Sequence, residues 1–316
     1  MKVLVTREIP ETGLRLLESF DVTVLSEQPP GRSELLEAAR GADGVLCTLT
    51  EKIDAEFMNA AGTGLKVVAN MAVGYDNVDL GAAKERGVIV TNTPEVLNET
   101  TADTAFMLLL AAARRLGEGE RLVRGGEWEA WGPKMLLGPD VWGKKLGVIG
   151  LGGIGEAVAR RAKGFGMELL YTGRSRNEEA EREFGARYLE LDGLLQESDF
   201  VSIHTPLTDE TQHLIGVAEL EKMKPEAVLV NTSRGPVVDE EALADALESR
   251  RIFAAGLDVY EEEPEVHPKL LKLENVVLAP HIGSASIETR DKMAILAAEN
   301  LQAVLSGEEP LNPVNP

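Results

Sequence analysis

One short segment, residues 145–155, limits the fold of this chain more than any other feature. An apolar strand runs into Gly150-Leu151-Gly152-Gly153-Ile154-Gly155, which fits G-x-G-x-x-G, and a strong helix former follows at residues 156–162. The first glycine permits the tight bend, the second lets the backbone approach a pyrophosphate, and the third lets the helix pack on the strand. The helix end offers free N–H groups to an anion. In this strand–turn–helix context, the segment predicts a dinucleotide-binding turn.

The rest of the chain alternates short apolar runs with longer helical patterns, which is typical of parallel sheets covered on both faces. A long helical pattern over residues 98–124 separates two such series, and a last helix is predicted over 286–306 and expected to pack back on the first domain. Strands are predicted at 2–6, 22–25, 44–48, 66–70 and 88–91, and again at 145–150, 168–172, 200–204, 227–232, 253–258 and 276–279.

We therefore predict an α/β protein with two doubly wound parallel-sheet domains. The first is a flavodoxin-like substrate domain, residues 1–97 plus 284–316, and the second is a Rossmann domain for NAD(P), residues 98–283.

Charge and cysteine content exclude several classes of protein. Lys and Arg number 32 against 53 Asp and Glu, so the net charge of −21 disfavours nucleic acid and anionic membranes as partners. The single cysteine, Cys47, leaves no disulfide and no cysteine cluster for a metal. No apolar run approaches the ~20 residues that cross a bilayer, and the N-terminus does not resemble a signal peptide. We expect a cytoplasmic protein.

The choice of cofactor depends on the turn after the next predicted strand. An NAD enzyme places a carboxylate there for the ribose hydroxyls. This chain instead has Gly173, Arg174, Ser175 and Arg176. Two guanidinium groups and a hydroxyl suit a 2′-phosphate, although a solvated basic turn is the alternative. We predict NADP(H) as the preferred cofactor, with NAD(H) as the second.

Three segments at the carboxyl ends of later strands carry chemistry, because ligands bind at that edge of an open α/β sheet. They are residues 231–235, 256–264 and 279–283. Arg234 suits a substrate carboxylate, and His281 can donate a proton to a keto oxygen as a hydride arrives. A nearby carboxylate would hold the histidine protonated and oriented. The alternatives are a surface ion pair for Arg234 and a core histidine for His281.

Spacing alone does not select the carboxylate, since Asp258, Glu261, Glu262 and Glu263 all lie in the acidic loop. The other three histidines are less suited to the chemistry. His204 is expected in the wall of the cofactor site, whereas His213 and His267 are expected on surface loops.

Five segments in order resemble the D-isomer-specific 2-hydroxyacid dehydrogenase family over essentially the whole chain, and its glyoxylate/hydroxypyruvate reductase branch in particular. They are residues 73–77, 150–155, 231–235, 263–264 and 280–283. The resemblance implies a catalytic triad of Arg234, Glu263 and His281. Glu263 and His281 would form the acid–base pair, and Arg234 would bind the keto acid.

The resemblance also implies binding roles that the residues alone do not reveal. Backbone N–H groups of Val73 and Gly74 would bind the substrate carboxylate, and Leu49 would line the same pocket. Trp131 would reach the site from the partner subunit of a homodimer, unless it only packs in the dimer interface. Besides residues 173–176, the implied cofactor contacts are Thr104, Leu151, Gly152, Gly153, Ile154, Thr232, Ser233, Arg234, Asp258, His281 and Gly283. The family often has a larger polar residue at the position of Gly153.

These observations predict an NADPH-dependent reductase that converts glyoxylate or hydroxypyruvate to glycolate or D-glycerate, with His281 as proton donor. One alternative is an NAD-dependent D-lactate or 3-phosphoglycerate dehydrogenase. The phosphoglycerate type is disfavoured, because the chain ends shortly after its last helix and leaves no room for a regulatory domain. Another alternative is a corepressor that senses dinucleotides without turnover.

Overall fold

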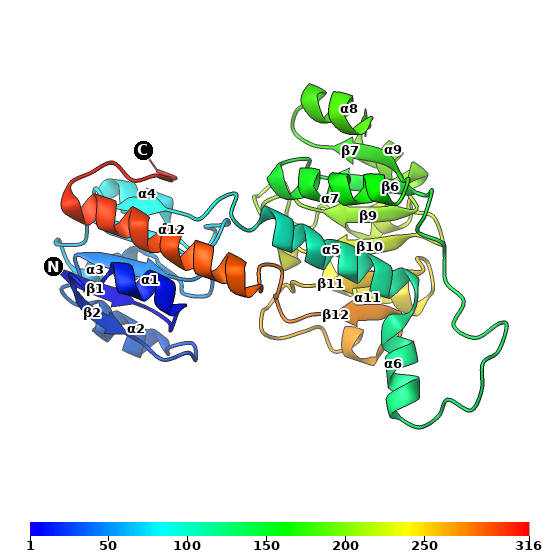
Figure 1. Ribbon diagram of the computed structural model, residues 1–316, viewed down its shortest axis with the longest axis horizontal. Coiled ribbons are helices and arrows are strands. Elements are labelled where there is room, and N and C mark those ends of the chain that lie inside the picture. Colours follow the sequence, from blue (N-terminus) through cyan, green and yellow to red (C-terminus); the bar gives the residue numbers. More distant parts are fainter. Residues whose placement is uncertain (316) are drawn as a thin grey trace. The chain divides into compact units, whose positions relative to one another are not determined.

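The computed structural model describes residues 1–315 and divides the chain into two compact units. Unit 1 combines Met1–Leu97 with the chain from Ala285 onward, and unit 2 is Asn98–Ser284. Each unit contains one sheet, and the neighbouring strands β1 to β12 within each sheet pair in parallel (Figure 1). The predicted α/β fold class is therefore confirmed.

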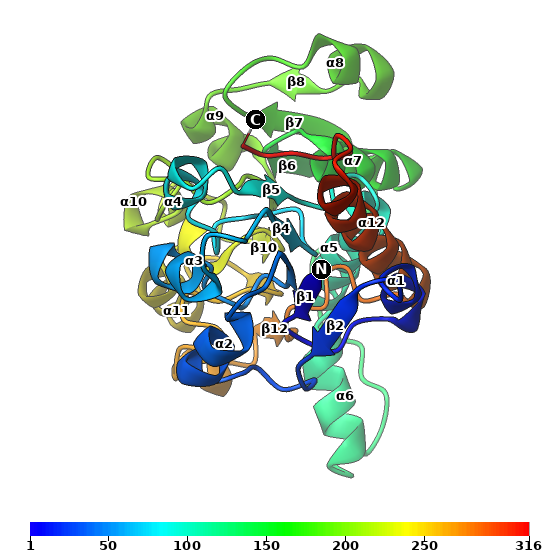
Figure 2. The ribbon, with the colours of Figure 1, turned by 90° about the vertical axis from the view of Figure 1, so that its left-hand side faces the viewer.

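Unit 1 has a five-stranded sheet in the order β2-β1-β3-β4-β5, which is the flavodoxin-like order. Helices α1 and α12 lie on one face of this sheet, and α2, α3 and α4 lie on the other (Figure 2). The strands are β1 (Lys2–Val5), β2 (Asp21–Val24), β3 (Gly44–Cys47), β4 (Val67–Asn70) and β5 (Ile89–Thr91). The helices are α1 (Glu11–Leu16), α2 (Arg32–Ala39), α3 (Ala55–Ala61), α4 (Leu80–Glu85) and α12 (Ile287–Ser306).

The sequence explains how these elements begin and why they are buried. Every residue of β3 and β4 is buried, because helices cover both faces of the sheet, and the two strands are apolar except for Asn70 at the end of β4. The side chains of Asp54, Asp79 and Ser286 each accept a backbone N–H at the start of α3, α4 and α12. Such caps satisfy donors that have no partner within the helix.

The chain after α12 covers one edge of the unit 1 sheet. It runs antiparallel to β5, where Asn92 N donates to Asn312 O over 3.2 Å and Val314 N donates to Val90 O over 2.9 Å. The side chain of Asn315 adds hydrogen bonds to the backbone of Val88 and Val90. An open strand edge is a template for pairing with other chains, so this segment protects it.

Unit 2 has a seven-stranded sheet in the order β12-β11-β10-β9-β6-β7-β8, a Rossmann sheet with one added edge strand. Its strands are β6 (Lys145–Ile149), β7 (Glu168–Thr172), β8 (Arg187–Tyr188), β9 (Phe200–Ile203), β10 (Val228–Asn231), β11 (Ala254–Leu257) and β12 (Val276–Leu278). Its helices are α5 (Asn98–Ala113), α6 (Leu116–Arg124), α7 (Gly153–Gly164), α8 (Glu178–Phe184), α9 (Leu191–Glu197), α10 (Val217–Leu220) and α11 (Glu240–Glu248), with short 3₁₀ turns at Gly235–Val237 and Leu270–Lys272.

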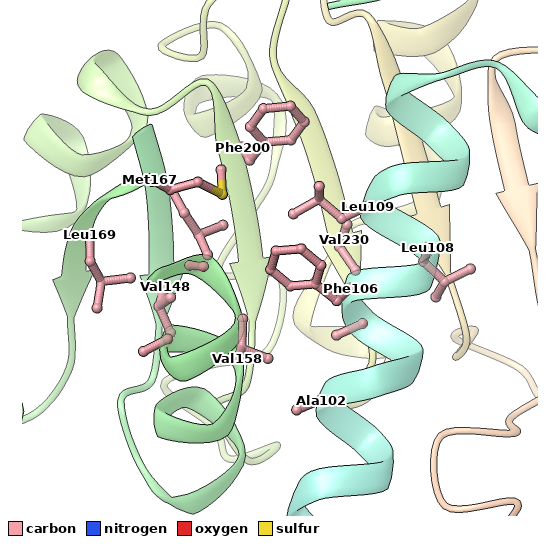
Figure 3. Packing of buried hydrophobic residues seen from close by; sticks show 14 of the residues in the cluster. Ala102, Phe106, Leu108, Leu109, Val148, Val158, Met167, Leu169, Phe200 and Val230 are labelled. Carbon is pink, nitrogen blue, oxygen red and sulfur yellow. The ribbon is translucent and has the colours of Figure 1, made fainter. Parts of the chain in front are cut away.

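Two apolar clusters hold unit 2 together, one on each face of its sheet. On one face Phe106 and Leu109 of α5 and Val158 of α7 pack on Val148 and Phe200 (Figure 3). The other cluster contains buried residues of α9, α10 and α11. Helix α5 therefore has a structural role within unit 2, beyond connecting the two predicted domains.

The predicted helix over residues 98–124 is wrong in one respect, because it is two helices. Arg115 separates α5 from α6 with a left-handed φ of 52°. Its guanidinium donates to both carboxylate oxygens of Glu118, which favours a bend at this position. No proline or glycine marks residues 114–115, so periodicity gave no signal. None of the helices within residues 1–315 combines the length and apolar character required to cross a membrane.

Candidate active site

The glycine turn after β6 has the geometry that the sequence predicts. Gly150 has a φ of +93°, and a Cβ there would lie 2.8 Å from the carbonyl oxygen of His204. A Cβ on Gly155 would lie 2.3 Å from the carbonyl oxygen of Gly150, so the helix packs directly on the turn. By contrast, no atom lies within 4 Å of a Cβ placed on Gly152, the residue before α7. Only Gly152 leaves open space for a ligand beside the helix end.

Gly153 also has a structural reason to be glycine. A Cβ at this position would lie 2.3 Å from Nδ2 of Asn98, the first residue of α5. A larger residue at position 153 would therefore require the side chain of Asn98 to move.

The carboxyl edge of the unit 2 sheet fits a dinucleotide. Strand order reverses between β6 and β9, and this switch point is where such folds bind ligands. Within residues 1–315, two buried polar atoms near it have no hydrogen-bond partner: Oγ1 of Thr232 and Nδ1 of His204. Burial lowers the pKa of His204 to about 3, so its ring is neutral, and Nε2 lies 2.8 Å from Ser202 Oγ. A bound cofactor could use the open space at Gly152 and could form hydrogen bonds with the unpaired atoms of Thr232 and His204.

The two arginines of the basic turn after β7, Arg174 and Arg176, differ in their contacts. The guanidinium of Arg176 donates through Nε and Nη2 to both oxygens of Glu181, over 3.0 and 2.7 Å. Tyr171 Oη donates to the same carboxylate over 2.6 Å. Arg174 is exposed, and its charge contributes to lowering the pKa of Glu210, after the larger effect of a hydrogen bond from Thr208. Arg174 is therefore the more available cation in this turn, whose other members, Gly173 and Ser175, are also exposed.

Asn177 fixes this basic turn to the glycine turn. Its Nδ2 donates to the carbonyl of Leu151 over 3.2 Å and to Glu156 Oε1 over 2.8 Å, while its Oδ1 caps α8. The two segments predicted to hold the phosphates of the cofactor are thus connected through one side chain.

The structure brings Glu263 and His281 together. Nδ1 of His281 lies 2.8 Å from Oε2 of Glu263, and the other carboxylate oxygen accepts the backbone N–H of Tyr260 over 3.1 Å. Burial acts to raise the pKa of Glu263, but the hydrogen bond and charge of His281, with a smaller effect of Arg234, lower it below its ordinary value. An ionised carboxylate on Nδ1 leaves Nε2 of the ring for a substrate.

Arg234 lies in a turn that is fitted against the same acidic loop. Asn231 at the end of β10 ties this turn together, accepting from Ser233 N and Oγ and donating to the carbonyl of Arg234 over 2.9 Å. A Cβ on Gly235 would lie 1.8 Å from the carbonyl carbon of Tyr260, so only glycine allows this contact. One Nη of Arg234 donates to Ser233 O over 2.8 Å.

Asp258 holds the turn that carries His281. Its two carboxylate oxygens accept the backbone N–H groups of Ile282 and Gly283, each over 2.7 Å, and burial raises its pKa. His281 has a left-handed φ of 54°, a conformation that costs about 1 kcal/mol or more in a non-glycine residue. Thr104 donates to the carbonyl of Gly283 over 3.3 Å. Asp258 and Thr104, both predicted as cofactor contacts, thus have protein partners that keep this turn in place.

The remaining predicted residues lie apart from the triad in the sequence. Leu49, Val73 and Gly74 are half-buried in loops of unit 1, after β3 and β4. Trp131 is 76% exposed in unit 2, on the loop after α6. His213 pairs with Glu261 over 3.0 Å, so Glu261 has a different partner from Glu263, which contacts His281. In the described residues 1–315, no group of three His, Cys, Asp or Glu could hold a metal ion.

Sequence reasoning missed the asparagines that position the site. The motif around Arg234 includes Asn231 without giving it a role, and Asn177 lies outside every motif. The Asn-x-Ser spacing of Asn231 and Ser233 is typical of an Asx turn, so that signal was available. No sequence signal indicated that Asn177 would reach the carbonyl of Leu151.

The comparisons with known proteins agree over the whole chain. Residues 106–283 match the family described as D-isomer specific 2-hydroxyacid dehydrogenase, NAD binding domain. A glyoxylate reductase from Korarchaeum cryptofilum is 55% identical, with 99% of this chain and 96% of that protein covered.

Two solved structures extend this similarity to the fold. The TT0316 protein from Thermus thermophilus has a TM-score of 0.94 at 48% identity, covering 99% of this chain and 100% of that one. An NADPH-dependent glyoxylate/hydroxypyruvate reductase from Sinorhizobium meliloti, in complex with NADP and malonate, has a TM-score of 0.88 at 37% identity, covering 99% and 96%.

Proposed function

Because the chain belongs to the D-isomer-specific 2-hydroxyacid dehydrogenase family, and is thus an NAD(P)-dependent dehydrogenase, we propose that it reduces glyoxylate and hydroxypyruvate. The products would be glycolate and D-glycerate. The observation that carries the proposal is the 2.8 Å hydrogen bond between Glu263 and His281, beside the Arg234 turn. Relatives named glyoxylate reductase support the choice of substrate.

Each residue of the proposed triad has a separate role in the reduction. Arg234 binds the carboxylate of the keto acid with its planar guanidinium. In unit 1, the N–H groups of Val73 and Gly74 are proposed as donors to a substrate carboxylate. A nicotinamide cofactor, when bound, would be the source of the hydride for the keto carbon. His281 donates its proton to the keto oxygen as negative charge develops there. Glu263 orients the ring and stabilises its protonated form, because its carboxylate is ionised and bonded to Nδ1.

The cofactor would lie along the carboxyl edge of the unit 2 sheet. The turn at residues 151–154 would receive the pyrophosphate, and Thr232, Ser233, Arg234, Asp258, His281, Gly283 and Thr104 would surround the nicotinamide half. The unpaired hydroxyl of Thr232 supports this assignment. Residues 173–176 would receive the adenosine ribose, with NADPH preferred over NADH.

Replacing Arg174 tests the preference for NADPH. We expect Arg174→Ala to lower the NADPH to NADH ratio of kcat/KM by roughly tenfold to a hundredfold, the value of one charge-assisted hydrogen bond to a phosphate. Arg176→Ala is the matched comparison, and it should change the ratio much less because Arg176 already donates to Glu181. Steady-state kinetics with both cofactors measure the ratio. An unchanged ratio in Arg174→Ala would show that Arg174 does not bind the 2′-phosphate.

The pH dependence of the two directions tests the role of His281. Reduction needs the protonated ring and oxidation needs the neutral ring, so reduction should slow and oxidation should accelerate as pH rises. Glu263 stays ionised on the acidic side because its pKa is lowered. Initial rates of both reactions from about pH 5 to pH 10 measure this. Profiles that move in the same direction would contradict a single proton donor and acceptor.

A panel of 2-keto acids tests the proposed function as a whole. Oxidation of NADPH is followed by its absorbance with glyoxylate, hydroxypyruvate, pyruvate and 3-phosphohydroxypyruvate. Turnover highest with the first two supports the proposal, and turnover highest with either of the others would favour the lactate or phosphoglycerate alternative. No turnover with any would favour a dinucleotide sensor.

We further propose a homodimer in which Trp131 contacts the partner, since its 76% exposure leaves it uncovered in one subunit.

A further inference from the structure

Two loops of unit 1 carry the residues proposed to meet the keto acid. One is the loop after β3 with Leu49, and the other is the turn of residues 72–74 after β4. We propose that Asn77 is a positioning residue that fixes these loops to each other and thereby determines both the affinity for the keto acid carboxylate and the discrimination against longer keto acids. This inference rests on the proposed function.

The turn of residues 72–74 presents its N–H groups because its carbonyls are held. Ala72 O accepts from Thr93 N over 2.9 Å, Val73 O accepts from Asn92 Nδ2 over 2.8 Å, and Gly74 O accepts from Asn70 Nδ2 over 2.8 Å. In a planar trans peptide, the C=O of one residue and the N–H of the next point in opposite directions. The bonds at Ala72 O and Val73 O therefore direct the N–H groups of Val73 and Gly74 away from their donors, and the bond at Gly74 O fixes the end of the turn.

Asn77 connects this arrangement to the loop of Leu49. Its Nδ2 donates to Thr48 O over 2.9 Å and to Glu51 O over 3.1 Å, and it lies 3.4 Å from Oδ1 of Asn70. Asn70 is the residue that holds the carbonyl of Gly74. One amide group thus contacts both ends of the Leu49 loop and the residue that fixes the last carbonyl of the 72–74 turn.

The rest of the Leu49 loop is rigid, so its position depends on how it is anchored. The buried carboxylate of Glu51 accepts from Thr6 Oγ1, Thr48 N, Thr48 Oγ1 and Thr50 Oγ1, over 2.6 to 2.9 Å. Glu51 is only 4% exposed. Thr6 lies just after β1, so the carboxylate of Glu51 both closes the loop and ties it to that strand. We infer that the amide of Asn77 then fixes the loop relative to residues 72–74.

The main chain around Asn77 has its own support, so its side chain can be replaced without unravelling the segment. Ile53 N donates to Asn77 O over 2.9 Å, and Asp79 N donates to Ile53 O over 3.0 Å. Asp79 also caps α4 with its side chain. Replacing Asn77 should therefore loosen the two loops while the surrounding backbone keeps its hydrogen bonds.

The test compares Asn77→Ala with wild type in three measurements. We expect KM for glyoxylate to rise roughly tenfold or more, since two hydrogen bonds are lost, while kcat at saturating glyoxylate stays within about threefold. The ratio of kcat/KM for glyoxylate to that for 2-ketobutyrate should fall, because Leu49 is no longer held close. The dissociation constant of NADPH, from protein fluorescence, should not change, since its proposed contacts belong to unit 2.

Matched variants separate positioning from stability. Asn77→Asp keeps the size of the side chain but loses both N–H groups, so it should raise KM at least as much as Asn77→Ala, and it replaces that variant if alanine prevents folding. Asn59→Ala, at an exposed asparagine that accepts from Arg86, should match wild type. A purely structural role would lower the melting temperature and kcat with KM unchanged, and that result would overturn the inference. Equal losses of keto acid and NADPH affinity would also overturn it.

The proposed function can fail independently of this inference. If wild type reduces no keto acid, the proposed function is wrong before any variant is compared. If wild type is active and both Asn77 variants keep its KM and its substrate ratio, only the positioning role is wrong.

Discussion

Replacing His281 with alanine should lower kcat for glyoxylate reduction by roughly 10²- to 10⁴-fold, the usual contribution of a positioned general acid. The ring is held by Glu263 through Nδ1, and no other histidine lies in hydrogen-bond contact with Glu263 in residues 1–315. Water would have to protonate the keto oxygen in the variant. Binding of NADPH should remain, because the glycine turn and the basic turn are untouched. Stopped-flow or steady-state absorbance of NADPH measures the rate, and fluorescence measures the binding.

His213→Ala is the matched control for this variant. His213 is also a half-exposed histidine paired with a glutamate, at 3.0 Å from Glu261, but it lies outside the triad. It should retain kcat close to that of wild type. A His281→Ala enzyme with nearly normal kcat would eliminate His281 as the proton donor, and an equal loss in both variants would point to a general effect of losing a histidine–glutamate pair.

Arg234→Ala should reduce kcat/KM for glyoxylate by roughly 10²- to 10⁴-fold, since two charge-assisted hydrogen bonds to a carboxylate are worth about 3–6 kcal/mol together. Arg234→Lys should recover only part of this loss, because lysine keeps the charge but not the planar fork. Steady-state kinetics with glyoxylate, with NADPH saturating, measure both variants. The smaller loss in the lysine variant distinguishes carboxylate binding from support of the fold.

Arg15→Ala provides the control, because Arg15 is an exposed arginine paired only with Glu11 on helix α1. Its kinetics should match wild type. If Arg234→Ala also lowered the melting temperature by many degrees, with Arg234→Lys equally affected, the turn at Asn231 and Gly235 would be collapsing. If both Arg234 variants bound and turned over glyoxylate normally, Arg234 would not be the carboxylate ligand.

Most of the fold could be predicted from the sequence because its strands are buried on both faces. Runs such as residues 44–47 and 228–230 are apolar throughout, and each lies in a strand of the structure. The two-residue strand β8 was missed because its residues are exposed or half-buried and too few to show a pattern. The bend at Arg115 was missed because a local side-chain contact with Glu118, rather than a helix-breaking residue, accompanies it.

The choice of Glu263 as the proposed catalytic carboxylate shows what the local sequence could not predict. Asp258, Glu261 and Glu263 are close in sequence, yet each has a different partner. Asp258 binds two backbone N–H groups, Glu261 pairs with His213, and Glu263 reaches His281. Long-range packing, including the contact of Gly235 with Tyr260, decides which carboxylate faces the histidine. Only the family resemblance could identify Glu263 in advance.

The division of unit 1 between the two ends of the chain has a consequence for synthesis on the ribosome. Residues 98–284 can complete their sheet while the last segment is still unmade, since domains fold as units during translation. Unit 1 cannot complete its structure at that stage, because α12 covers β3 and β4 and the segment at Asn312–Asn315 forms hydrogen bonds along β5. Residues 1–97 are therefore made before residues 98–284 but reach their final structure after them, because one face of their sheet stays incompletely covered until α12 has been made.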